Sequence, residues 1–262
     1  MSMECLVFDI ETVPDTELGA RLLGLQDLSD EDIAKAMFFN RLQESGAEFL
    51  PLFQHRVVAI SVALRSGAGD FSVWTLGDES SDEAELVRRF YDGIEKYRPT
   101  LVSWNGSGFD LPVLHYRALK HSVQAPAYWE TGDRDREYRF NNYLSRYHWR
   151  HVDVMDVLSG FQPRARAKLD AVATMLGFPG KMGMSGDKVW DSYRAGELAT
   201  IRNYCESDVL NTYLVYLRFQ HMRGLLSDKL LAAELDRVRS ALAEADAAHL
   251  QEFLAAWTDG TS

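Results

Sequence analysis

The chain is poor in cysteine and has no long hydrophobic run. Its two cysteines among 262 residues, Cys5 and Cys205, lie in segments that we expect to be buried. Neither a disulfide framework nor a zinc site is indicated, so both are interpreted as small core residues. No apolar run approaches the roughly 20 residues that span a bilayer, and the N-terminus lacks a basic segment followed by a cleavage site. A cytoplasmic protein that does not enter a membrane is expected.

Net positive charge is also lacking, since the chain carries −11 at pH 7. This excess argues against tight nonspecific binding to polyanions. Basic residues nevertheless gather between residues 134 and 188, where His148 and His151 are interleaved with them. They are Arg134, Arg136, Arg139, Arg146, Arg150, Arg164, Arg166, Lys168, Lys181 and Lys188. Each is compatible with an ordinary solvated surface, whereas together they could hold a phosphate backbone.

Internal repeats and low-complexity tracts are absent as well, and a 46% hydrophobic content is ample for one sizeable core. Short apolar runs predict strands over residues 4–10, 56–64, 71–76, 100–104 and 151–158. Helical spacing predicts helices over residues 81–97, 111–120, 169–176 and 197–222, and one amphipathic helix over 227–257. The polar, helix-like stretch 15–48 is interpreted as an insertion that covers one edge of the sheet.

These elements predict an α/β fold, with a mixed β-sheet flanked by helices, an N-terminal insertion and a C-terminal helix. The first three strands follow one another directly, which predicts an antiparallel meander. The later strands alternate with helices. We divide the chain into one compact domain over residues 1–225 and a helical extension over residues 226–262.

The first chemical pattern is Asp9-Ile10-Glu11, at the end of the first predicted strand. Residues i and i+2 of a strand point to the same face, so both carboxylates aim at one place. Two like charges raise one another's pKa unless a cation lies between them. The pattern alone is common, and its plain alternative is a solvated strand end.

Two further patterns place acidic residues on other elements. Asp110 follows the glycine-rich corner 105–108 between a strand and a helix, where the alternative role is a helix cap. Tyr204 and Asp208 are four residues apart on the long late helix, and so share one helical face. Their alternative roles are a tyrosine packed in the core and a solvated aspartate.

The three patterns, in this order, resemble the three exonuclease motifs of the DEDD superfamily, whose fold is ribonuclease-H-like. They read D-x-E, N-x-x-x-F-D and Y-x-x-x-D. The tyrosine resembles the DEDDy branch, because Asn203 occupies the position where the other branch has histidine. The spacing looks like that of the proofreading domain of family B DNA polymerases. The resemblance covers roughly residues 4–216. Too little chain follows Asp208 for a polymerase, so a stand-alone relative is expected.

The resemblance implies a two-metal-ion 3′→5′ exonuclease that releases nucleoside 5′-monophosphates. Its metal ligands are then Asp9, Glu11, Asp110 and Asp208, which hold two Mg²⁺ or Mn²⁺ ions, and Tyr204 orients the attacking water. Single-stranded DNA 3′ ends are the favoured substrate, with modest, salt-sensitive binding. No protein partner is indicated.

Substrate contacts are expected from two regions. Asn105 and Phe109 are assigned to the pocket for the terminal nucleotide, with Phe109 or Trp104 available to stack on the base. Arg164, Arg166 and Lys168 are assigned to the phosphates of the strand. Asp153 and Asp156 are interpreted as structural.

Three alternatives remain open on the sequence alone. An RNA 3′ exonuclease resembling ribonuclease D shares the tyrosine, and no motif reports on the sugar. A nucleic-acid-binding module without activity is disfavoured, because four clustered acids without metal are destabilising. A nucleotide-binding oxidoreductase is weakly suggested by the corner 105–108, but G-x-G-x-x-G does not follow.

Overall fold

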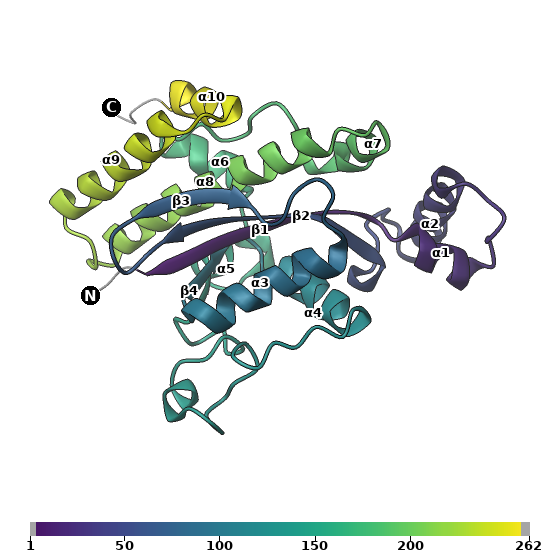
Figure 1. The fold of residues 1–262 in the computed structure, drawn as a ribbon, viewed down its shortest axis with the longest axis horizontal. Coiled ribbons are helices and arrows are strands. Elements are labelled where there is room, and N and C mark those ends of the chain that lie inside the picture. The colour runs from purple at the N-terminus through teal and green to yellow at the C-terminus, as the bar shows by residue number, and fades with distance from the viewer. Residues whose placement is uncertain (1–3, 258–262) are drawn as a thin grey trace.

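A mixed five-stranded sheet in the order β3-β2-β1-β4-β5 forms the centre of the computed structural model, which describes residues 4–257 (Figure 1). β1 (Cys5–Pro14) pairs antiparallel with β2 (His55–Arg65), which pairs antiparallel with β3 (Phe71–Thr75). On its other side β1 pairs parallel with β4 (Thr100–Ser103), and β4 pairs parallel with β5 (His151–Asp153). The predicted α/β class and the predicted meander are therefore confirmed.

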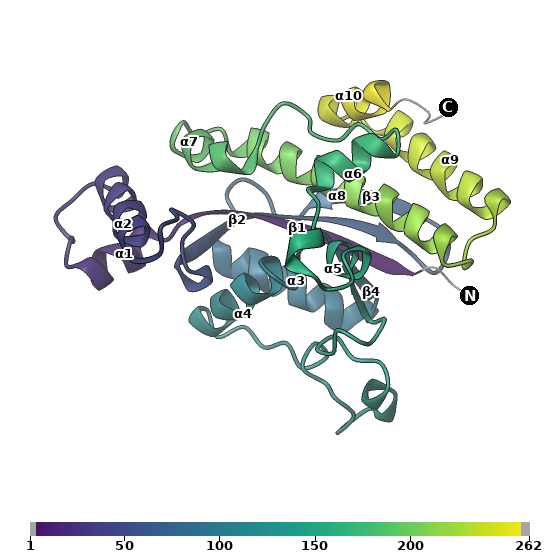
Figure 2. The same ribbon diagram turned by 180° about the vertical axis from the view of Figure 1, so that it is seen from behind.

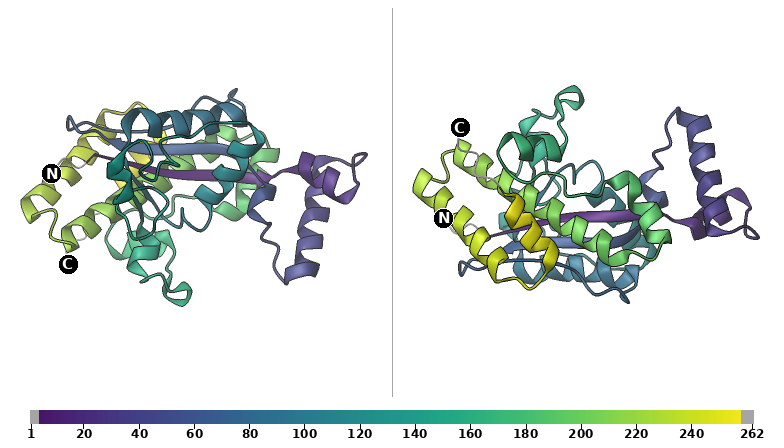
Figure 3. Two further views of the ribbon diagram at one scale, coloured as in Figure 1. Left: turned by 90° about the horizontal axis from the view of Figure 1, so that it is seen from below. Right: turned by 90° about the horizontal axis from the view of Figure 1, so that it is seen from above.

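Helices cover both faces of the sheet because successive residues of β1 point to opposite sides. Leu6, Phe8 and Ile10 pack with α3 (Glu83–Tyr97) and α4 (Asp110–Lys120). Val7 packs on the other face, where α8 (Leu198–Met222) crosses the strands and α6 (Leu169–Met175) adjoins it. Figure 3 shows this layering from both sides. The alternation turns Asp9 and Glu11 toward α8.

The fifth predicted strand is wrong in length. β5 ends at Asp153, and residues Val154–Leu158 form the short helix α5. The Asp153 carboxylate accepts a hydrogen bond from Asp156 N at 3.2 Å and so caps this helix. A short alternating apolar run fits either a strand or a buried helix, and the cap decides between them here.

The single C-terminal helix predicted over residues 227–257 is also wrong. The chain forms α9 (Asp228–Glu244) and α10 (Ala248–Ala256), separated by a break at residues 245–247. The Gln251 side chain donates hydrogen bonds to the carbonyl oxygens of Leu242 and Ala245, at 2.8 and 2.7 Å. These bonds satisfy acceptors at the end of α9 and stabilise the break.

The N-terminal insertion does not cover a sheet edge. α1 (Thr16–Leu23) and α2 (Asp30–Ser45) pack on each other beyond the C-terminal end of β1, away from the edge strands β3 and β5 (Figures 1 and 2). Before α8, residues 189–194 form a further helix that the sequence did not predict, α7 (Val189–Arg194). Arg194 on α7 forms an ion pair with Glu31 on α2. The insertion therefore borders α7.

Within residues 4–257 no helix is long and apolar enough to cross a membrane.

A buried ion pair fastens α9 to the sheet. Arg65 on β2 donates from Nε and Nη2 to the two carboxylate oxygens of Glu234 at 2.8 and 2.7 Å. Removing one partner of such a pair leaves a buried charge, so Glu234→Ala should lower the free energy of unfolding by about 3–5 kcal/mol in urea denaturation. Glu244→Ala, at an exposed position of α9, should change it by less than about 0.5 kcal/mol. Equal, small effects of both substitutions would show that α9 contributes little to the fold.

Candidate active site

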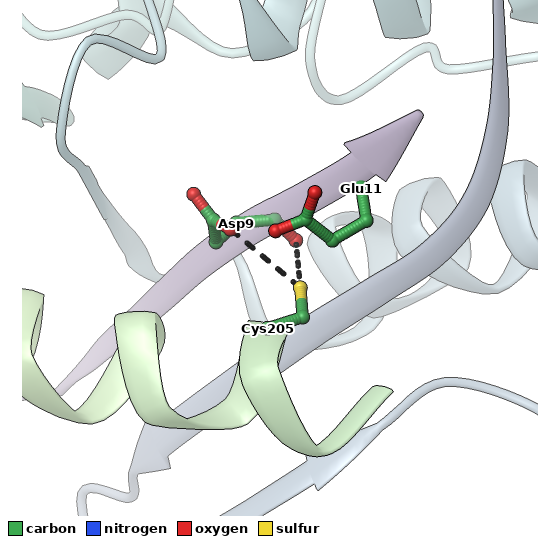
Figure 4. Close-up of side chains that lie close together, drawn as sticks. All are labelled: Asp9, Glu11 and Cys205. Carbon is green, nitrogen blue, oxygen red and sulfur yellow. Dashed lines mark hydrogen bonds between the residues drawn. The ribbon is translucent and has the colours of Figure 1, made fainter. Parts of the chain in front are cut away.

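The two carboxylates of β1 meet at the face of the strand that α8 covers. Glu11 is only 8% exposed, which contradicts the alternative of a solvated strand end. The register of β1 against β2 shifts between Glu11 and Thr12, and bulges of this kind often re-aim side chains beside active sites. Figure 4 shows Asp9 and Glu11 side by side above α8.

Cys205 is part of this cluster, which the sequence did not reveal. The thiol is buried, as predicted, and it donates to the main-chain oxygen of Asp9 at 3.5 Å and to its Oδ2 at 3.6 Å (Figure 4). Asp9, Glu11 and Cys205 can each bring one ligand atom within 4.8 Å of the others. Burial raises the pKa of the thiol well above its usual value, so the sulfur stays protonated and is a hydrogen-bond donor.

Asp110 is the first residue of α4, and its carboxylate turns back to β1. Its Oδ1 accepts a hydrogen bond from Ile10 N, at 3.1 Å, between the two acids of the first motif. The N-cap residue of α4 is Phe109 and no side chain caps the helix, so the alternative role of Asp110 as a cap is wrong. Asp110 is instead tied to the strand that carries Asp9 and Glu11.

Tyr204 and Asp208 reach the site from α8, on the same helical face. Burial raises the pKa of Asp208 to about 6, although the nearby Tyr204 hydroxyl acts to lower it. Burial, and then the negative charges of Asp208 and Glu11, raise the pKa of Tyr204 above its usual value. Tyr204 is therefore a neutral phenol at physiological pH and can donate a hydrogen bond.

The electrostatics of the cluster favour a cation. Burial first, and then the charges of Asp110, Glu11 and Asp208, raise the pKa of Asp9 well above its usual value. Burial, Asp208 and Asp110 do the same for Glu11, and burial raises the pKa of Asp110 to about 7. These carboxyl groups resist ionisation unless a positive charge lies close to them. Their oxygen atoms are the hard ligands that suit a divalent cation such as Mg²⁺ or Mn²⁺.

Asp153 holds the glycine-rich corner before Asp110. Its carboxylate accepts hydrogen bonds from Asn105 N and Ser107 N at 3.0 and 2.9 Å, and Asn105 has a positive φ of 67°. A Cβ on Gly106 would lie 2.3 Å from the Ser103 hydroxyl oxygen, so this turn needs glycine there. The interpretation of Asp153 as structural agrees with these contacts.

Replacing Asp153 by alanine should lower the free energy of unfolding by about 1–3 kcal/mol, because the amides of the corner lose their acceptor. Asp153→Asn keeps one acceptor oxygen and should lose less. Urea denaturation with and without Mg²⁺ measures both. If Asp153→Ala kept its stability but lost its response to Mg²⁺, Asp153 would be a ligand and this assignment would be wrong.

A cleft of about 680 Å³ opens beside Glu11. Asn105 and Phe109 line it, together with aromatic residues that the sequence did not single out: Phe49, His55 and Trp190. The Phe109 ring lies 5.8 Å from Phe49 and 5.2 Å from His55, centroid to centroid, so these rings form one wall. Phe49 and His55 belong to segments outside the three motifs, which is why the motifs could not reveal them.

The other residues assigned to substrate lie elsewhere. Trp104 is half-buried against the core beneath α8 rather than among the residues of this cleft. Arg164, Arg166 and Lys168 are exposed on the segment between α5 and α6, and Arg166 Nη2 donates to Asp156 Oδ1 at 2.7 Å. Their contact with a nucleic acid stays a prediction.

The chain is similar to parts of DNA polymerases. It is 27% identical over 151 residues to the catalytic subunit of DNA polymerase epsilon from Saccharomyces cerevisiae, covering 54% of this chain and 6% of that protein. It is 27% identical over 164 residues to a DNA polymerase of Archaeoglobus fulgidus, covering 61% of this chain and 20% of that protein. The chain thus spans a small part of these relatives.

The family B DNA polymerase from Pyrobaculum calidifontis matches 92% of this chain and 28% of its own, with 21% identity and a TM-score of 0.48.

The family model that matches the chain covers residues 47–257, so it includes Asp110, Tyr204 and Asp208 but not β1 with Asp9 and Glu11. Its description is a predicted 3′-5′ exonuclease related to the exonuclease domain of PolB. The expected resemblance and the expected class of enzyme, a 3′→5′ exonuclease, are confirmed at the level of the family. Exonuclease domains of this type use divalent metal ions, in agreement with the acidic cluster. The chain therefore belongs to the family of predicted 3′→5′ exonucleases related to the exonuclease domain of PolB.

Proposed function

We propose that this protein is a two-metal-ion exonuclease that removes nucleoside 5′-monophosphates from the 3′ end of single-stranded DNA. The observation that carries the proposal is the convergence of Asp9, Glu11, Asp110 and Asp208 from β1, α4 and α8. Asp110 is hydrogen-bonded to β1, and the charges of Asp110 and Asp208 act on both acids of that strand. No shared structural purpose explains four half-buried or buried acids at one place.

The four carboxylates are the groups that would hold Mg²⁺ or Mn²⁺. Two divalent ions there would supply the positive charge that activates the attacking water and stabilises the leaving oxygen in an in-line displacement. Tyr204, a neutral phenol beside Asp208, would orient that water through its hydroxyl group. Cys205 positions Asp9 rather than reacting, because its thiol stays protonated.

The cleft beside Glu11 is the place for the terminal nucleotide. Asn105 supplies a polar group there, and Phe109 supplies an aromatic ring held against Phe49 and His55. An aromatic wall favours an unpaired base that can stack, and so a single strand over a blunt duplex. DNA is favoured over RNA because the similar proteins named above are DNA polymerases. We place this activity in residues 1–225, in the cytoplasm.

The test is hydrolysis of 5′-labelled single-stranded DNA and RNA of one sequence, with Mg²⁺, Mn²⁺ or EDTA. A ladder shortening from the 3′ end, dependent on metal and faster on DNA, is expected. Tyr204→Phe should slow it by roughly 10²-fold or more, the size of a lost acid–base or orienting group. Tyr97→Phe, on α3 at the opposite face, should leave it unchanged. Faster cleavage of RNA would reassign the substrate, and no cleavage with any metal would favour a binding module.

A further inference from the structure

A second hollow is lined in part by the glycine-rich corner. It has a volume of about 190 Å³, and its lining includes Ser107 from the corner, Asp153 from the end of β5, and Tyr147, Trp149 and Phe161. Asn105 and Phe109 belong to the same corner but line the cleft beside Glu11. Residues 105–109 thus contribute to the lining of both hollows.

This second hollow is basic and aromatic. The Arg146 guanidinium lies 5.2 Å from the Tyr147 ring centroid and 5.4 Å from that of Phe161. Arg223, the C-cap residue of α8 and not part of this lining, lies 3.6 Å from the Trp149 ring centroid. Tyr147 is nevertheless 75% exposed and Trp149 45% exposed. Large aromatic side chains left open to solvent beside arginines are the composition of a stacking platform for unpaired bases.

The segment that carries these rings is held in place by its own hydrogen bonds. Asn142 N donates to His148 Nδ1 at 3.0 Å, and Trp149 N donates to Asn141 Oδ1 at 3.1 Å. Arg150 Nε donates to the main-chain oxygen of Asn141 at 2.7 Å. Because the ends of the loop are fixed, the aromatic rings are presented without a large loss of conformational freedom on binding.

We propose that this hollow is a second base-binding subsite, which stacks an unpaired base of a single DNA strand whose 3′-terminal nucleotide occupies the cleft beside Glu11. The inference rests on the proposed exonuclease function. A hollow of about 190 Å³ has room for a ring-sized group. Arg146, beside Tyr147 and Phe161, neutralises a phosphate next to that base.

The subsite predicts a difference between short and long substrates. A p-nitrophenyl ester of thymidine 5′-monophosphate can occupy only the terminal site, whereas a ten-nucleotide strand reaches both. Tyr147→Ala and Trp149→Ala should each weaken binding of the labelled strand about tenfold, the effect of about 1.4 kcal/mol, within the range for one stacked base. Turnover of the mononucleotide ester should stay the same. Fluorescence anisotropy with EDTA present measures binding without cleavage.

Phe140→Ala is the matched control, because Phe140 lies on the same segment, is 83% exposed and is not among the residues of the hollow. It should change neither measurement. Affinity lost equally in all three variants, or in none, would overturn the subsite, and so would an equal loss of activity on the ester. Failure of the unchanged protein to cleave either substrate would instead contradict the exonuclease function, while anisotropy would still report on the subsite.

Discussion

Replacing Asp9 by asparagine is expected to abolish exonuclease activity and, at the same time, to stabilise the metal-free protein. Activity should fall on the order of 10⁴-fold, as when one member of a catalytic constellation is removed. Stability should rise because Asp9 is half-buried beside Asp110, Glu11 and Asp208, whose charges raise its pKa further. The neutral amide removes that repulsion. Melting curves in EDTA at pH 8 should shift upward by about 2–4 °C for each kcal/mol gained.

Asp15→Asn is the control, for which the melting temperature should fall instead of rise. The Asp15 carboxylate is 2% exposed and pairs with Arg117 at 2.6 Å and with Lys120 at 3.0 Å. Loss of this charge leaves buried Arg117 with fewer partners, so the variant should melt lower. If Asp9→Asn also melted at a lower temperature in EDTA, the acids of the site would not repel one another. The proposed cation would then have no repulsion to neutralise.

The second large effect is that Mg²⁺ should raise the melting temperature strongly at pH 8 and weakly at pH 6. Burial raises the pKa of Asp110 to about 7 and that of Asp208 to about 6. Carboxyls whose folded-state pKa lies above the unfolded value, about 3.9 for aspartate, stabilise the fold at low pH. That contribution is lost as the pH rises through about 6 to 7.

A bound cation reverses this dependence of stability on pH, because it binds the ionised carboxylates and must displace their protons. Mg²⁺ at about 100 times its dissociation constant adds about 2.7 kcal/mol, or roughly 5–10 °C at pH 8. Each proton that must be displaced lowers the apparent affinity about tenfold per pH unit below these pKa values. Differential scanning fluorimetry at fixed ionic strength measures the shift. Equal shifts at both pH values, or a full shift in Asp208→Asn, would contradict the proposed ligand set.

The site was predictable wherever the repeat of a strand or a helix determines which way a side chain points. Alternation along a strand places Asp9 and Glu11 on one face, and helical spacing places Tyr204 and Asp208 on one face, whatever surrounds them. The strand–helix order of the chain likewise predicted the meander and the mixed sheet. These properties depend on neighbours in sequence, so they can be predicted without knowledge of tertiary packing.

Boundaries were less predictable because single side chains decide them. Asp153 caps α5 and shortens β5, and Gln251 stabilises the break between α9 and α10. In both places an apolar pattern continues through the boundary. A hydrogen bond from one side chain outweighs the weak preference of a few residues for the longer element.

By itself, then, the sequence determined the fold class, the faces on which the acidic residues lie and the family they resemble. Only the tertiary structure decided that Cys205 contacts Asp9, that Asp110 turns back to Ile10, and that Phe49 and His55 join Phe109 in one aromatic wall. Cys205 lies 196 positions from Asp9 and Asp110 lies 100 from Ile10. Contacts across such separations depend on how whole elements pack, and no local period in the chain encodes them.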